Sequence, residues 1–186
     1  FADMLLGGEI SPRLYQMYLH AQLQNYMALE SAVTVPIELE PIFRSAQIEQ
    51  DLQEIESLYD LDEIEENMLS VNEYISHIQM LTEENNEESL LAHLYVRHFG
   101  DAHGGQIIKR NVPGSGSMYE FEDRRGLIAG VRELLHDGMA DEAKICFEYA
   151  ERLFHELMEE YHNSPDEFES SEAIFASINN SDEWEE

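Results

Sequence analysis

The sequence predicts an all-α protein, folded as a single-domain irregular helical bundle. Apolar residues recur at steps of three and four through most of the chain, as expected for helices that bury one face. We find no alternating polar and apolar stretch long enough for a strand, no internal repeat and no heptad run. At 186 residues, of which 43% are hydrophobic, the chain is long enough for one buried core and gives no reason to invoke a second.

The expected helices follow the periodic segments in chain order. The first begins at Ser11-Pro12, which suits an N-cap followed by proline in the first turn, and it ends before Pro36. Proline, glycine and acidic breaks separate the later segments, and the clearest loop is NVPGSGS. The expected helices cover residues 11–33, 42–59, 70–82, 87–110, 123–135 and 140–161.

The domain division follows from a change in composition near the end of the chain. We expect a helical domain over residues 1–162 and an acidic tail over residues 163–186. The tail is rich in acidic residues and poor in long apolar patterns, so we expect it to be partly disordered or to lie on the surface.

The acidic composition excludes one class of partner. A formal net charge of −30 sets 10 Lys and Arg against 40 Asp and Glu, whereas binding to phosphates needs clustered basic side chains. We therefore expect neither nucleic acid nor a membrane as partner, and no apolar run reaches the roughly 20 residues that span a bilayer. We see no signal peptide. The single cysteine, Cys146, cannot form an intramolecular disulfide, which favours a cytoplasmic location.

The segment LYVRHFGDAHGGQIIKR, residues 94–110, places Gly100, Gly104 and Gly105 inside a predicted helix. Each glycine in a helix interior costs about 1 kcal/mol relative to alanine. Either a kink or a close approach of the backbone to something flat would justify them. From spacing alone, a C-cap at Gly104-Gly105 that ends the helix stays equally open.

Residues 95–106 resemble the distal-helix motif of heme oxygenases, Tyr-x-Arg-x-[Leu/Phe]-Gly-Asp-x-x-Gly-Gly-Gln. Further stretches are similar to segments of that family: YMALE at 26–30, IEQDL at 48–52 and AKICFEYAERLFHELM at 143–158. The resemblance covers residues 1–162, with the region 111–145 shorter than is usual in the family.

The resemblance implies an enzyme for which heme is both substrate and cofactor, cleaved with O2 and reducing equivalents to biliverdin, ferrous iron and carbon monoxide. The distal helix would bend at Gly100, Gly104 and Gly105, so that bare backbone lies against the heme. Asp101 would order the water that delivers a proton, and Arg97 would belong to the same water network. From the residues alone, a surface carboxylate and a solvated arginine are ordinary interpretations of these two positions.

The resemblance also implies side chains around the heme. Tyr95 would lie near a propionate, and Arg132 or alternatively Arg125 would pair with a propionate through its forked guanidinium. From the residues alone, aromatic and Met side chains at helical spacing are more often plain core. The pocket wall would comprise Phe147, Phe154, Met158 and Tyr26.

The resemblance places the proximal histidine of the family, which binds the heme iron, about eight residues before Phe1. Either a preceding helix carries it, which we favour, or the protein lacks this ligand. His93, His98 and His103 lie on the glycine-bearing helix, the wrong side for a proximal ligand. His103 replaces a residue that is commonly small in the motif. It is a partner in the distal network, a sixth ligand of the iron or, as we favour, an ordinary core or surface histidine.

Two alternative functions stay open. Helical bundles also hold di-iron sites built from Glu-x-x-His pairs, and Glu133/His136 and Glu159/His162, with Glu30, offer such ligands. With 40 acidic residues in the chain, two such pairs are no more than chance gives, and we assign no metal ligand. The alternatives are thus a heme-oxygenase-like di-iron oxidase and a non-catalytic heme-binding protein on the same fold.

The partners expected are heme and an electron donor such as ferredoxin or a flavin reductase, and we expect a monomer. Because ferredoxins are acidic, a protein with a net charge of −30 should repel one unless a basic patch survives. The basic residues that could form this patch are Arg97, Lys109, Arg110, Arg124 and Arg125.

Overall fold

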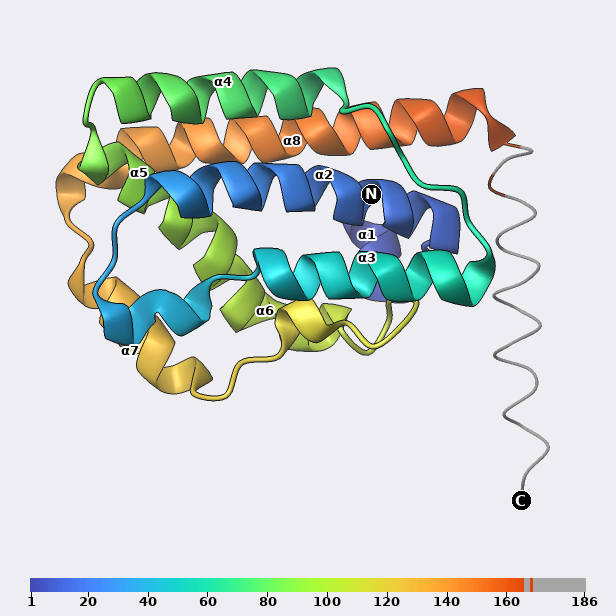
Figure 1. Cartoon of the computed structure of the whole chain (residues 1–186), viewed down its shortest axis with the longest axis horizontal. Coiled ribbons are helices and arrows are strands. Elements are labelled where there is room, and N and C mark those ends of the chain that lie inside the picture. Colours follow the sequence, from blue (N-terminus) through green and yellow to red (C-terminus); the bar gives the residue numbers. More distant parts are fainter. Residues whose placement is uncertain (166–167, 169–186) are drawn as a thin grey trace.

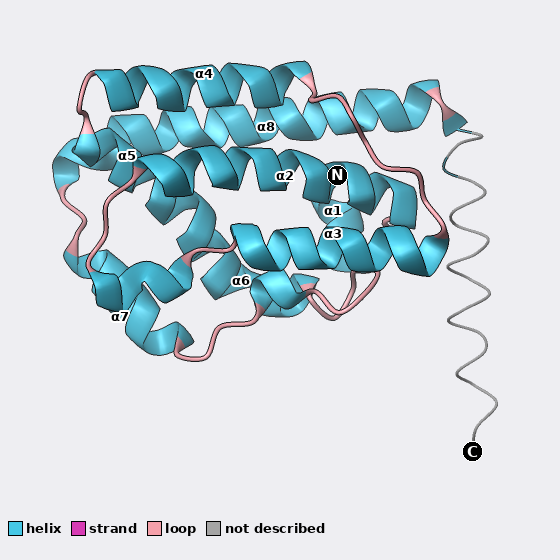
Figure 2. Cartoon of the chain, in the orientation of Figure 1, coloured by secondary structure: helices cyan, strands magenta, loops and turns pink. Residues whose placement is uncertain are grey.

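The computed structural model describes residues 1–165 and 168, and all regular structure among them is helical (Figure 2). This confirms the predicted all-α class. The helices are α1 (Ala2–Gly7), α2 (Pro12–Ala32), α3 (Ser45–Tyr59), α4 (Leu69–Glu83), α5 (Glu87–Leu94), α6 (Gly100–Ile108), α7 (Arg124–Glu133) and α8 (Ala140–Asn163). The 3-10 turns are η1 (Ile37–Ile42), η3 (Ser117–Tyr119) and η4 (Asp137–Met139), and a π-helical turn, η2 (Tyr95–Phe99), joins α5 to α6.

Each helix expected from the periodicity is present, with ends displaced by a few residues. The sequence patterns miss α1 and η1, and the expected helix 123–135 ends at Glu133. Gly8 ends α1 in the left-handed conformation (φ 75°), which a residue without a Cβ adopts at no steric cost.

Helix α2 is the centre of the fold. It packs against α3 on one side and against α4 on the other, and it also contacts α5 and α8 (Figure 1). Ser11 caps its N-terminus, where the hydroxyl oxygen accepts a hydrogen bond from the backbone N–H of Leu14 at 3.2 Å. Because helices surround α2, it buries residues on most of its circumference.

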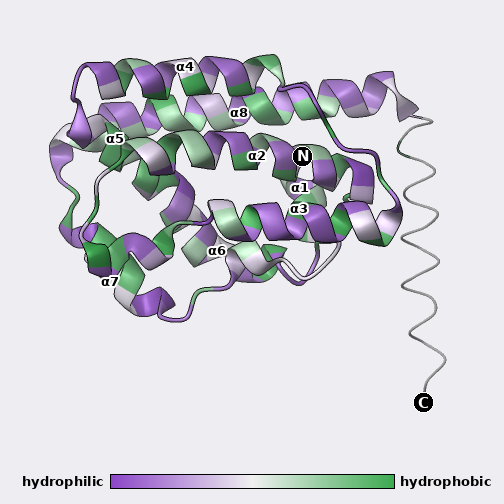
Figure 3. Ribbon diagram, viewed as in Figure 1, coloured by the Kyte–Doolittle hydropathy of each residue, from purple (hydrophilic) through white to green (hydrophobic). Residues whose placement is uncertain are grey.

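Two clusters of buried apolar side chains make up the core. One surrounds the N-terminal half of α2 together with α3 and the C-terminal half of α8, and the other surrounds the C-terminal end of α2 together with α4, α5 and α7. Hydrophilic residues, purple in Figure 3, alternate with apolar ones along the helices, as expected for amphipathic helices at a surface.

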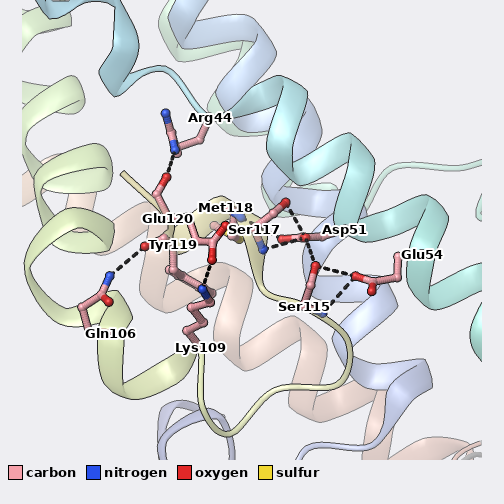
Figure 4. A network of polar contacts seen from close by, with 10 residues as sticks. All are labelled: Arg44, Asp51, Glu54, Gln106, Lys109, Ser115, Ser117, Met118, Tyr119 and Glu120. Carbon is pink, nitrogen blue, oxygen red and sulfur yellow. Dashed lines mark hydrogen bonds and ion pairs between the residues drawn. The ribbon is translucent and has the colours of Figure 1, made fainter. Parts of the chain in front are cut away.

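The connection between α6 and α7 is anchored by Asp51 of α3, which is buried. Its Oδ1 accepts hydrogen bonds from the backbone N–H (2.8 Å) and the hydroxyl (2.6 Å) of Ser117, and its Oδ2 accepts one from the N–H of Met118 (2.9 Å; Figure 4). The side chain of Gln106 in α6 donates to the carbonyl oxygen of Tyr119 at 2.7 Å. These contacts fix Tyr119 against α6.

The described part of the acidic tail is short. Phe168 is buried, and its ring centroid lies 5.1 Å from that of Tyr161. Residues 166–167 and 169–186 lie outside the described residues, so the division into a domain and a tail stays a prediction. Among the described residues, no helix combines the length and apolar character required to span a membrane.

Candidate functional site

The glycine-bearing segment is one helix with a wide turn in its middle. α5 ends at Leu94, residues Tyr95–Phe99 form the π-helical turn η2, and α6 follows directly from Gly100. Such turns contain an extra residue and are frequent at functional sites. Gly104 and Gly105 lie inside α6, so the C-cap interpretation is wrong. The irregular turn lies directly before Gly100, and a bend at the glycines themselves stays a prediction.

The three glycines have different surroundings. A Cβ at Gly100 or Gly104 would meet no other heavy atom within 4 Å, and both positions are exposed. A Cβ at Gly105 would overlap the ring of Tyr119. Close packing inside the protein therefore explains Gly105, whereas Gly100 and Gly104 leave a bare strip of backbone on the surface of α6. A flat ligand on this strip would explain both glycines.

Asp101 lies beside this strip and contacts the central helix. The hydroxyl of Tyr26 in α2 donates a hydrogen bond to its Oδ2. Burial raises the pKa of Asp101 to about 7, although the hydrogen bond from Tyr26 and the charge of Arg97 act in the opposite direction. A carboxyl with this pKa is present in both protonation states near neutral pH, as a group that transfers protons requires.

Arg97 is buried, with 7% of its surface exposed. Its guanidinium lies 4.0 Å from the ring centroid of Tyr74, and its Nη1 donates to Oε1 of Gln22 at 3.2 Å. Within the described part of the chain, Nε of Arg97 finds no hydrogen-bond partner, as fits a side chain that binds ordered water near Asp101. Because Arg97 is buried, its inclusion in a basic surface patch is wrong.

A cationic pocket of about 440 Å³ lies between α6 and α7. The guanidinium of Arg132 lies 5.2 Å from the ring centroid of Phe99, and the ring of His103 stacks on Phe99 at 5.5 Å. The structure thus brings both arginines proposed to pair with a propionate to one pocket, next to the bare strip of α6. The residues that line the pocket are His103, Arg124, Arg125, Ile128, Ala129 and Arg132.

Three aromatic candidates differ in their surroundings. Tyr95 is partly buried, packs against the core cluster of α5 and α7, and lies 4.7 Å from Phe99 between ring centroids. Phe147 of α8 is 58% exposed. The plain-core interpretation of Phe147 is therefore wrong, and its ring is free to contact a ligand. Phe154 packs on Phe1 with ring centroids 5.0 Å apart and is partly buried in the core.

Two histidines of the glycine-bearing segment have partners inside the core. Nε2 of His98 lies 2.7 Å from Oε1 of Glu30, and Nε2 of His93 lies 2.8 Å from Oε1 of Glu142. Both rings are fully buried, whereas His103 is exposed. Their acidic partners are distant in sequence, so the sequence carries no local signal for either contact.

The Glu-x-x-His pairs do not form a di-iron centre in the described residues. His136 lies 3.4 Å from Glu88 in an exposed pair, and Nδ1 of His162 bonds to the carbonyl oxygen of Met158. In the described part of the chain, one group of side chains could hold a metal ion, and it contains neither Glu-x-x-His pair. This group consists of His77, His93 and Glu142.

Comparison with known proteins decides the relationship. Residues 1–156 match the family model described as Heme oxygenase. The chain belongs to the heme oxygenase family. The heme oxygenase of Rhodella violacea is 30% identical over 139 residues, which cover 66% of this chain and 58% of that protein. The chain thus spans less than two thirds of the length of this relative.

Solved structures of heme oxygenases share the fold. The heme oxygenase of Leptospira interrogans matches with a TM-score of 0.71 and 26% identity, over 83% of this chain and 88% of that chain. Heme oxygenase-1 of the cyanobacterium Synechocystis, solved in complex with heme, matches with a TM-score of 0.71 and 23% identity, over 96% and 88% of the two chains. Membership in the heme oxygenase family confirms the relationship expected from the distal-helix motif. The roles of single residues stay predictions.

Proposed function

We propose that the protein is a heme oxygenase, which cleaves heme to biliverdin, ferrous iron and carbon monoxide with O2 and electrons from a donor. One observation carries this proposal: the bare backbone strip at Gly100 and Gly104 lies beside Asp101, whose carboxyl changes protonation near neutral pH. Family membership and the likeness to a heme-bound structure support it.

The residues present fit heme in shape and charge. A Cβ at Gly100 or Gly104 would occupy the space that a porphyrin face needs, and both positions are free of other heavy atoms. Arg125 and Arg132 line the neighbouring pocket and provide guanidinium groups for two propionates. We propose that Arg132 pairs with a propionate, that Arg125 supports it, and that Gly105 keeps α6 seated against Tyr119.

The chemical step divides between the ligand and the chain. When bound, heme supplies the iron that activates dioxygen and is itself the substrate. Asp101 holds and releases a proton at Oδ1, the oxygen that Tyr26 does not bond. Arg97 favours the ionised form of Asp101 through its charge and binds the water that connects this carboxyl to the ligand. Tyr95 keeps Phe99 in place at the edge of the pocket.

The electron donor is proposed from the surface charge. Arg110, which follows α6, and Arg125 and Arg132 of α7 are exposed. Exposed cations on an otherwise acidic protein suit an acidic donor such as ferredoxin or a flavin reductase. We further propose a monomer in the cytoplasm, where the buried thiol of Cys146 stays reduced.

The test is to add heme to the full-length protein and then supply O2 and a reductant. Decay of the heme Soret band with appearance of biliverdin and release of carbon monoxide supports the proposal. A heme complex that persists unchanged under these conditions contradicts it and indicates a non-catalytic heme-binding protein. Binding of iron but not of heme would contradict it in favour of a di-iron oxidase.

A further inference from the structure

Three metal-ligating side chains converge where α4, α5 and α8 meet. They are His77 of α4, His93 of α5 and Glu142 in the first turn of α8. Nε2 of His77 lies 2.5 Å from Oε1 of Glu142, and Nε2 of His93 lies 2.8 Å from the same oxygen. All three ligand atoms lie within 4.8 Å of one another. The cluster uses none of the residues assigned to the heme site.

We propose that this cluster binds one divalent transition-metal ion, Zn²⁺ or Fe²⁺, through Nε2 of His77, Nε2 of His93 and the carboxylate of Glu142. Two imidazoles and one carboxylate are a ligand set that holds Zn²⁺ in many proteins and Fe²⁺ in non-heme iron sites. Three protein ligands leave positions for water. The ion binds without heme, so the proposal does not rest on the proposed function.

His93 and Glu142 are in the protonation states that a metal ion needs. Burial lowers the pKa of His93 to about 4, so its ring is neutral at pH 7. Burial favours the protonated form of Glu142, but hydrogen bonds from His77 and His93 outweigh this effect and lower its pKa, which keeps the carboxylate ionised. A neutral imidazole and an ionised carboxylate are the ligating forms.

The surroundings hold the ligands in position and leave an entrance. Nδ1 of His93 lies 3.1 Å from the hydroxyl of Tyr74, so a ring that binds metal through Nε2 can donate its Nδ1–H to this oxygen. His93 is fully buried, whereas the side chains of His77 and Glu142 are 13% and 14% exposed. The ion therefore enters from the side of His77 and Glu142.

One nearby charge opposes a cation at this place. The guanidinium of Arg97 lies 4.0 Å from the ring centroid of Tyr74, and its charge contributes to the low pKa of His93. The negative charge of Glu142 is therefore indispensable for the proposed site. Without a metal ion, the same three side chains would form a hydrogen-bond cluster in which both Nε2–H groups donate to one carboxylate oxygen.

The experiment is a metal titration of heme-free, chelator-treated full-length protein. Zn²⁺ and Co²⁺ are followed by calorimetry and by the visible absorption of Co²⁺, and Fe²⁺ is added under anaerobic conditions. We expect one equivalent to bind, with affinity reduced at least about 100-fold in His77→Ala and in Glu142→Gln. The matched control is His136→Ala, which removes an exposed histidine–carboxylate pair and should bind as the wild type does.

Two results would overturn the proposal: no saturable binding of any of the three ions, or equal affinity in wild type, His77→Ala and Glu142→Gln. If a variant fails to fold by circular dichroism, X-ray absorption of the Zn²⁺-loaded wild type decides instead. Two imidazole nitrogens and one carboxylate oxygen, with water oxygens at the remaining positions, support the site, and any other set of protein ligands contradicts it.

Discussion

The hydroxyl of Tyr26 and the carboxylate of Asp101 share a hydrogen bond that joins the central helix α2 to the glycine-bearing helix α6. This bond fixes one carboxylate oxygen and leaves the other for exchange of a proton. The burial that accompanies it raises the pKa of Asp101 to about 7. The stability of the fold and the proposed chemistry therefore both depend on the protonation state of Asp101.

We expect Asp101→Asn to change how stability depends on pH. Because the pKa of Asp101 rises from 3.8 to about 7 on folding, the folded protein holds a proton that the unfolded chain has lost. This contribution to the free energy of unfolding is fully present below the unfolded pKa of 3.8 and is lost as pH rises to the folded pKa of about 7. Denaturant unfolding of both proteins measures the effect. The stability of the variant relative to wild type should therefore increase as pH rises from about 4 to about 7 and stay constant above that range. If the difference in the free energy of unfolding between variant and wild type does not change with pH, the pKa of Asp101 is not raised.

We expect Asp101→Ala to separate heme binding from turnover. The side chain lies beside the bare strip and not on the cationic pocket, so heme affinity should stay within about twofold of wild type. Loss of a positioned proton donor typically slows a reaction at least about 100-fold, and the biliverdin yield should fall accordingly. Heme titration and biliverdin absorbance measure the two effects. An unchanged biliverdin yield would remove Asp101 from the mechanism.

The glycines of α6 provide a matched pair of substitutions. Gly105→Ala should lower the free energy of unfolding by about 1–3 kcal/mol, because its Cβ overlaps the ring of Tyr119. Gly104→Ala should raise the stability of the heme-free protein by up to about 1 kcal/mol, because alanine favours a helix and meets no neighbour there. The same Cβ should weaken heme binding. Unfolding curves and heme titrations test both, and tight heme binding by Gly104→Ala would exclude this strip as the heme face.

We expect Arg132→Ala to lower heme affinity about 10-fold, because a charge-assisted hydrogen bond to a propionate is lost. A change in the ratio of biliverdin isomers should accompany it, since that pair fixes the rotation of the macrocycle. Lys144→Ala is the control: it removes an exposed cation of α8 that pairs with Asp141. Spectroscopic titration and product chromatography give both readouts. If only Arg125→Ala weakens binding, the role of Arg132 is wrong.

The anchor at Asp51 can be tested through stability alone. Asp51→Asn should lower the free energy of unfolding by about 2 kcal/mol, because a buried carboxylate that accepts several hydrogen bonds loses its charge. Glu49→Gln on the exposed face of the same helix should change it by less than about 0.5 kcal/mol. Chemical denaturation compares the two variants. Equal stabilities would show that other contacts hold the connection before α7.

The periodicity of the sequence predicts the helices well and the short elements poorly. α1 and η1 have six residues each, too few turns for a period to show. The turn Tyr95–Phe99 carries the side-chain pattern of an ordinary helix and differs only in its backbone hydrogen bonds. Its presence therefore could not be predicted from residue types.

The candidate site was predictable only where a local motif carries it. The distal-helix motif identifies Asp101 and the glycines, but the contact with Tyr26 joins residues 75 positions apart. The burial of Arg97 depends on the ring of Tyr74, another distant partner. His77 and Glu142 meet only because three helices converge. Because the two residues are far apart in the chain, no sequence motif indicates that they are in contact.

The π-helical turn also has a geometric consequence for α6. Each residue advances a helix by about 100°, so the extra residue between Tyr95 and Phe99 sets the angle at which α6 faces α2. Deleting one residue there would rotate the carboxylate of Asp101 away from Tyr26 and turn the glycine strip with it. The rotation of α6 about its own axis is thus set by a single residue inserted in the preceding turn.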